Sequence, residues 1–180
     1  NDSSHSVVGP NTVGDMTQYA VTMAPIDGLS LAASYYIMDA AGNIGARQEN
    51  EGGSYSANYS MGPVSLGYGE TLHAPSQRMS TASTTAKTNY YDNNAFSLGF
   101  AVNDALSVSY TEENSEKKTK ATSVANAVTR TAVEMEIETI DLAYTVGGMT
   151  LSVSNSETKN ASYIEGDDVT ETIVAMSMAF

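Results

Sequence analysis

The chain ends on Thr170–Phe180, TETIVAMSMAF, in which side chains of two kinds alternate without interruption. Successive side chains of a β-strand point to opposite faces, so this segment has one largely apolar face and one face of mixed character. The apolar face carries Thr172, Val174, Met176, Met178 and the terminal Phe180. The other face carries Glu171, Ile173, Ala175, Ser177 and Ala179. The pattern predicts a strand that is apolar on one side.

The same alternation recurs along the chain. Period-two runs lie at residues 19–23, 29–38, 56–61, 64–69, 95–101, 106–111, 140–146, 149–156 and 170–180. In most of these runs a large apolar or aromatic residue alternates with Ser, Thr, Gly, Ala or Asn. Runs of this kind predict about nine β-strands, and no segment has the period of an amphipathic helix.

Short and long connections alternate between these strands. Short connections at residues 24–28, 62–63, 102–104 and 147–148 contain the Gly, Asn and Asp residues that tight hairpins require. Long segments at residues 39–53, 73–87, 115–130 and 159–168 are rich in Gly, Ser, Thr, Asn and charge, so we expect loops there. Short turns at one end of a sheet and long loops at the other are typical of outer-membrane barrels. The sequence therefore predicts an all-β fold, an antiparallel up-and-down transmembrane β-barrel.

The composition limits the class of protein. The 180 residues include no Cys and no Trp, and 21 acidic residues against 8 basic residues give a formal net charge of −13. This charge argues against nucleic-acid binding, and the lack of Cys removes thiolate chemistry. A membrane-spanning helix needs ~20 consecutive apolar residues, which the sequence does not offer, whereas a spanning strand needs only ~9 to 11 residues.

The alternating strands, the Gly62-Pro63 and Gly147-Gly148 turns and the terminal AMSMAF resemble the C-terminal half of a general porin, the sixteen-stranded trimeric β-barrel of the Gram-negative outer membrane. The resemblance covers the chain from Asp15 onward. In that family the last strand and its terminal Phe are recognised by the outer-membrane assembly machinery. The resemblance therefore implies an assembly signal at Phe180, Met178 and Met176. It also implies a homotrimer in contact with lipid and lipopolysaccharide, which conducts small hydrophilic solutes and ions by passive diffusion.

In such a barrel the apolar rows face lipid and the small polar rows face water. Aromatic residues near the ends of the outward rows are expected to form two interfacial belts. One belt comprises Tyr35, Tyr55, Tyr68 and Tyr110, and the other comprises Tyr59, Phe100, Tyr144 and Phe180.

The inward rows supply the candidate pore-lining residues. By parity, Asp141 and Glu171 are the only carboxylates that we expect on the inward face within a strand. The polar candidates beside them are Ser34, Asn58, Ser97, Ser109 and Ser152. The acidic balance of the chain suggests a preference for cations, because negative walls concentrate counter-ions.

Three further carboxylates, Glu134, Glu136 and Glu138, continue the outward row of Ile140. They are weak candidates for Ca²⁺ or Mg²⁺ ligands that bridge to lipopolysaccharide phosphates. A solvated strand extension, or a bulge that turns them inward, is the interpretation we favour. Otherwise we expect no cofactor, no metal site and no enzyme activity, since His5 and His73 lie in loop-like segments without a nucleophile at a recognisable spacing.

We assign residues 1–14 to the tail of an extracellular loop and residues 15–180 to the C-terminal part of a single barrel domain. Nine antiparallel strands leave the first and last parallel, so they cannot close a barrel in the usual manner. We therefore expect a longer polypeptide, roughly twice this length, with further strands upstream. Two alternatives remain. One is a complete outer-membrane barrel of eight to ten strands with a binding or structural role, and the other is a secreted soluble β-sheet protein such as an adhesin.

Overall fold

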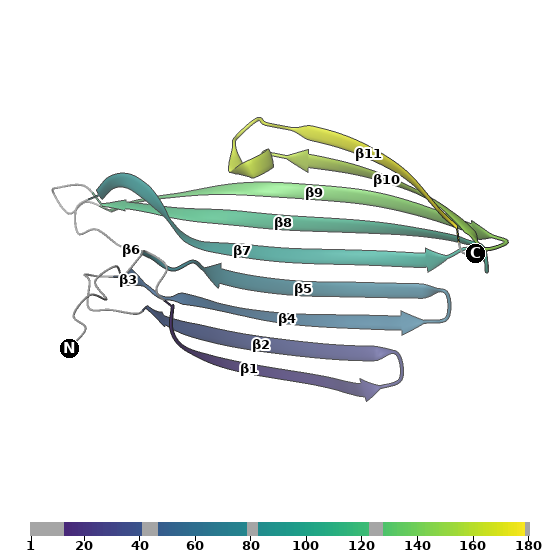
Figure 1. Cartoon of the computed structure of the whole chain (residues 1–180), viewed down its shortest axis with the longest axis horizontal. Coiled ribbons are helices and arrows are strands. Elements are labelled where there is room, and N and C mark those ends of the chain that lie inside the picture. The colour runs from purple at the N-terminus through teal and green to yellow at the C-terminus, as the bar shows by residue number, and fades with distance from the viewer. Residues whose placement is uncertain (1–12, 41–46, 79–82, 123–127, 179–180) are drawn as a thin grey trace, which may run out of the picture.

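The computed structural model describes residues 13–40, 47–78, 83–122 and 128–178. These residues form an all-β fold built on one nine-stranded antiparallel sheet (Figure 1). Apart from two short strands, consecutive strands are neighbours in the sheet, so its topology is up-and-down. The nine strands are β1 (Val13–Ile26), β2 (Leu29–Ala40), β4 (Asn50–Met61), β5 (Val64–Ala74), β7 (Ser83–Ala101), β8 (Leu106–Thr122), β9 (Val128–Val146), β10 (Met149–Lys159) and β11 (Val169–Met178).

Two small elements lie outside this sheet. The strands β3 (Arg47–Gln48) and β6 (Gln77–Arg78) pair with each other, and the 3-10 helix η1 (Ala161–Tyr163) lies between β10 and β11. The sequence pattern did not predict these three elements, because each is too short to show a period. Within the described ranges, no helix has the length and apolar character needed to cross a membrane.

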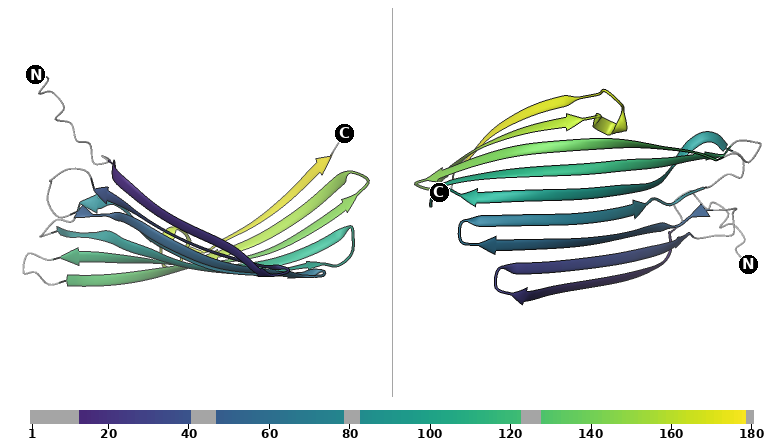
Figure 2. Two further views of the ribbon diagram at one scale, coloured as in Figure 1. Left: turned by 90° about the horizontal axis from the view of Figure 1, so that it is seen from below. Right: turned by 180° about the vertical axis from the view of Figure 1, so that it is seen from behind.

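The sheet has two open edges. Within the described part of the chain, β1 pairs only with β2 and β11 only with β10. The sheet is curved, and its edge strands lie far apart without meeting (Figures 1 and 2). The predicted count of about nine strands is confirmed. The described residues do not close the sheet into a barrel.

The four short turns occur where the sequence predicts them. Gly147 and Gly148 have φ values of 56° and 81°, the left-handed backbone of the tightest hairpin turns. In the β7–β8 turn, Oδ1 of Asn103 accepts hydrogen bonds from the backbone N–H groups of Ala105 at 2.9 Å and Leu106 at 3.0 Å. The side chain of Asn103 therefore completes the turn that its residue type predicted.

At the other end of the sheet the strands extend further than we expected. β4 begins at Asn50, β7 at Ser83 and β9 at Val128, and β8 continues to Thr122. The prediction of loops over residues 39–53, 73–87 and 115–130 is therefore wrong for much of each segment. Polar residues can continue a strand when a neighbouring strand pairs with their backbone groups, and β-branched Thr favours the extended conformation. β1 likewise begins at Val13, two residues before the predicted domain boundary.

The strand register gives the sheet two different faces. The apolar face carries directly paired apolar residues across seven strands: Met61, Val64, Phe100, Val108, Leu142, Val153 and Val174. The polar face carries Ser, Thr, Gly and Ala at most positions between them. Along β7 and β9 the polar face is half-buried, whereas Leu98 and Ile140 on the apolar face are 40% and 55% exposed. The sheet therefore bends around its polar face.

Close packing on the polar face explains its small residues. A Cβ atom added at Gly67 would lie 2.4 Å from Oγ of Ser97, and one at Gly99 would lie 2.4 Å from Oγ of Ser65. On the apolar face nothing among the described residues covers the side chains, and Ala74, 9% exposed, is the one buried apolar residue there or elsewhere in the described ranges. The fold therefore has no apolar core between layers within the part of the chain that the structure describes.

Candidate functional site

The polar face holds all seven pore-lining candidates. Ser34, Asn58, Ser97, Ser109, Asp141, Ser152 and Glu171 come from seven strands, and the register brings them to the same face. Neighbouring polar groups bond across the strands. The hydroxyl groups of Ser34 and Ser54 are 2.7 Å apart, and Ser109 donates to Oδ2 of Asp141 at 3.4 Å. Parity therefore predicted correctly that these seven residues share one face of the sheet.

The polar face also carries residues that parity did not identify. Glu113 of β8 lies opposite Ala95 and Ile137 on this face, so Asp141 and Glu171 are not the only carboxylates on the polar face. The sequence pattern did not predict Glu113 on this face, because the alternation of apolar and small residues ends at Thr111. Met135 and Ile137 of β9 lie on the same face. The expectation of small side chains throughout is therefore wrong for this part of β9.

A row of aromatic rings crosses the polar face near its loop end. The hydroxyl of Tyr36 on β2 and Nδ1 of His73 on β5 share a hydrogen bond of 2.7 Å. The ring of His73 stacks with that of Tyr91 on β7 at a centroid distance of 6.3 Å and an interplanar angle of 12°. Tyr91 in turn contacts Tyr163 of η1 at a centroid distance of 5.6 Å. We call these four residues the aromatic row.

The row depends on a glycine. Gly52 of β4 lies between β2 and β5, and a Cβ atom there would be 2.8 Å from Cε1 of Tyr36. Because Gly52 has no side chain, Tyr36 can reach across β4 to His73. The expectation that His73 is a solvated loop residue is therefore wrong, since β5 extends to Ala74 and brings His73 into the sheet. His5 lies outside the described residues.

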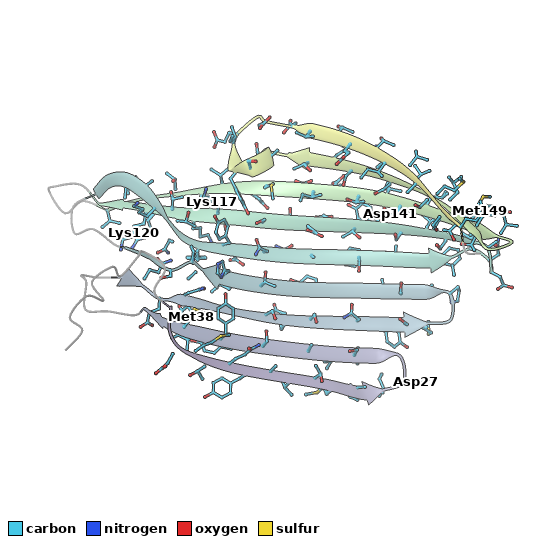
Figure 3. All side chains as sticks on the ribbon, in the orientation of Figure 1. Asp27, Met38, Lys117, Lys120, Asp141 and Met149 are labelled. Carbon is cyan, nitrogen blue, oxygen red and sulfur yellow. The ribbon has the colours of Figure 1, made fainter. Side chains whose placement is uncertain are left out.

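The segment between β10 and β11 lies over the polar face. The hydroxyl of Tyr163 and Oγ of Ser115 on β8 are 2.6 Å apart, and Nζ of Lys117 lies 5.4 Å from the centroid of the Tyr163 ring. Ser115, Lys117 and Tyr91 all belong to the polar face of β7 and β8. Lys117 lies towards the loop end of the sheet and Asp141 towards the turn end (Figure 3). We call Asn160–Asp168 the arm.

The carboxylates at 134, 136 and 138 lie on the apolar side of the sheet, where parity placed them. Glu138 is directly paired with Glu112 and Glu157, and Glu136 with Lys159. Nζ of Lys159 donates to Oε1 of Glu136 at 2.7 Å, and this hydrogen bond holds the pKa of Glu136 below its usual value. No group of three acidic or histidine side chains within the described ranges has a geometry that could hold a metal ion.

A second ion pair lies on the same side of the sheet, nearer its loop end. Nζ of Lys118 contacts Glu116 at 2.8 Å and Asp92 at 3.7 Å, and it lies 4.9 Å from the centroid of the Tyr90 ring. The hydrogen bond to Glu116 raises the pKa of Lys118. The apolar side of the sheet therefore carries charged side chains at its loop end, beyond the apolar rows.

The predicted assembly residues lie on the apolar face. Met176 pairs with Leu151 and Met178 with Met149, and their side chains are 64% and 51% exposed. Phe180 lies outside the described residues. Comparison of the chain with models of protein families, with curated proteins and with solved structures found no match.

Proposed function

We propose that this chain contributes to a water-filled β-barrel channel of the general porin kind in the outer membrane of a Gram-negative bacterium. The channel allows small hydrophilic solutes and ions to diffuse passively, and the chain has no catalytic role. The observation that carries the proposal is the uncovered apolar face. Leu98, Phe100, Ile140, Val174 and Met176 are between 40% and 65% exposed on one continuous surface. Soluble monomers rarely expose a contiguous apolar patch of this kind.

The lengths and the two faces of the strands support the same proposal. β11 has 10 residues and β5 and β10 have 11 each, close to the ~9 to 11 residues of a tilted membrane strand. Hydroxyl-bearing and glycine residues on the polar face suit the wall of an aqueous channel. A soluble sandwich would instead bury its apolar face against a second sheet.

The finer features of the proposal follow from the acidic groups and from the resemblance. Asp141, Glu171 and Glu113 give the polar face a negative character, so we propose a preference for cations. A homotrimer, contact with lipopolysaccharide and recognition of the last strand during assembly rest on the resemblance to general porins.

The test is to isolate the native protein from membranes and reconstitute it. We expect that detergent is needed to extract it from the outer-membrane fraction, and that it produces stepwise conductance in a planar lipid bilayer. Recovery in the aqueous phase without detergent would favour a soluble secreted protein instead. A detergent-soluble protein without conductance would favour a small barrel with a binding or structural role.

A further inference from the structure

We propose that the arm, through Tyr163, sets the upper size limit for solutes and that Lys117 moderates the cation preference at the same level. This inference rests on the proposed channel function. It assigns specificity to residues that the sequence pattern placed in an ordinary surface loop. It also gives a physical role to the aromatic row, which otherwise has none.

The first step is the reach of the arm. The strands that Tyr163 contacts, β7 and β8, are separated from β10 by β9. At ~4.8 Å per strand, the distance from β10 to β8 is roughly 10 Å across the sheet. The hydrogen bond to Ser115 and the contact with Tyr91 therefore place the arm over the polar face. If that face lines a channel, the arm lies inside the passage.

The second step is that the arm is held in place. Nδ2 of Asn160 donates to the backbone oxygen of Glu134 on β9 at 2.8 Å, and its Oδ1 accepts from the backbone N–H of Gly166 at 2.9 Å. The backbone N–H of Asn160 donates to Oδ1 of Asp168 at 3.0 Å. These bonds fix both ends of the arm to each other and to the sheet.

Backbone conformation gives a second sign that the arm has a defined shape. Asn160, Ser162 and Tyr163 have φ values of 51°, 57° and 59°, in the left-handed region that residues other than Gly rarely occupy. Such conformations persist where surrounding contacts enforce them, and they are concentrated at functional positions. Here they direct the Tyr163 ring towards β7 and β8.

The third step is that the arm completes a row at one level of the face. The aromatic row runs across the strands from β2 to the arm. Towards the turn end the same face carries small side chains, among them Gly67, Ser97, Gly99, Ser109 and Ser152. The level of the aromatic row is therefore where side chains occupy the most space. Tyr36, His73 and Tyr91 rise from strands, whereas Tyr163 reaches the row from the arm that lies over the sheet.

Charge at this level differs from charge elsewhere on the face. Among the described residues of the nine-stranded sheet, Lys117 is the one lysine or arginine on the polar face. Its ammonium group lies beside the Tyr163 ring. A single cation at the level of the aromatic row opposes the negative wall formed by Glu113, Asp141 and Glu171, and its effect is strongest if that level is where the passage narrows.

The main experiment compares single-channel conductance and solute uptake for the native protein and three variants. Tyr163→Ala should raise conductance and allow uptake of a trisaccharide that the native channel retards, whereas Tyr163→Phe should change both only slightly because the ring remains. Tyr68→Ala, a matched loss on the apolar face, should leave both unchanged. Lys117→Gln should shift the reversal potential in a salt gradient towards stronger cation selectivity.

A second measurement covers the case in which Tyr163→Ala does not fold. The chain has no Cys, so Lys117→Cys gives a single thiol at the level of the Tyr163 ring, and labelling that thiol with a bulky water-soluble reagent should lower the conductance. Unchanged conductance of the fully labelled channel would overturn the placement of the arm at a narrow level. A folded Tyr163→Ala channel with native conductance and native exclusion of the trisaccharide would overturn the inference and leave the proposed function intact. No conductance from the native protein would overturn both.

Discussion

At the scale of single residues, adjacent positions in one strand should respond oppositely to the same substitution. Val108 lies between Phe100 and Leu142 on the apolar face, and Ser109 lies beside Asp141 on the polar face. Under the proposed placement, Val108→Arg puts a cation in the hydrocarbon region and should cost ~2 to 4 kcal/mol of the free energy of unfolding. Ser109→Arg should be tolerated, because its guanidinium faces water and the carboxylate of Asp141. Reversible denaturant titration of the protein folded into lipid vesicles measures both, and equal losses would contradict the assignment.

Parity was sufficient to predict which face each such residue occupies, because the period of a strand is fixed at two. It predicted Asp141 and Glu171 on the polar face, and the register agrees. It did not predict the contact between Tyr163 and Ser115, which are 48 residues apart. A contact of that kind depends on the path of a connection and on the order of several strands, and no local pattern encodes either.

At the scale of elements, two hairpin turns should differ in how much stability they lose when their glycine is replaced by alanine. Gly28 and Gly62 both have positive φ, at 79° and 57°. A Cβ atom at Gly28 would lie 2.2 Å from the backbone oxygen of Ser60, whereas one at Gly62 would meet nothing within 4 Å. Gly62→Ala should cost about 1 kcal/mol of the free energy of unfolding for the left-handed backbone alone.

The Gly28→Ala variant should lose clearly more stability than Gly62→Ala, because the β1–β2 turn must also move away from β4. The backbone N–H of Ser60 donates to the oxygen of Gly28 at 2.9 Å, so this movement weakens a bond between two hairpins. The difference in unfolding free energy between the two variants isolates the steric effect from the backbone effect. Equal stabilities would mean that the contact between the hairpins is not close in solution.

Sequence reasoning located the elements better than their ends. The hairpin turns contain residue types that tight turns favour, such as Asn103, so their positions were predicted correctly. The opposite strand ends have polar residues that suit a loop or a solvated strand equally well. Thr119 and Thr131 show the difficulty, since their hydroxyl groups are 2.6 Å apart across β8 and β9 in a segment whose composition predicted a loop.

At the scale of the whole molecule, backbone groups along β1 and β11 have no partner strand among the described residues. Strands that alternate in direction give the first and ninth the same direction, so these two edges cannot pair with each other in an antiparallel ladder. In hydrocarbon each unpaired backbone group costs several kcal/mol, and open edges are not tolerated there. We therefore predict that in the native assembly both edges pair with strands formed by residues other than 13–178.

Hydrogen exchange and cross-linking of the native protein test this prediction together. Backbone amides at the edges of the sheet, near Tyr19 on β1 and Val174 on β11, should exchange as slowly as those in the middle of β8, since partner strands protect them. Tyr19→Cys with Met176→Cys should form no disulfide within one chain, because the edges lie apart. Fast exchange at either edge would mean that the edge is open to water. A disulfide between the two edges would mean that these strands close on themselves. Either result would contradict the predicted partner strands and would leave the uncovered apolar face unexplained.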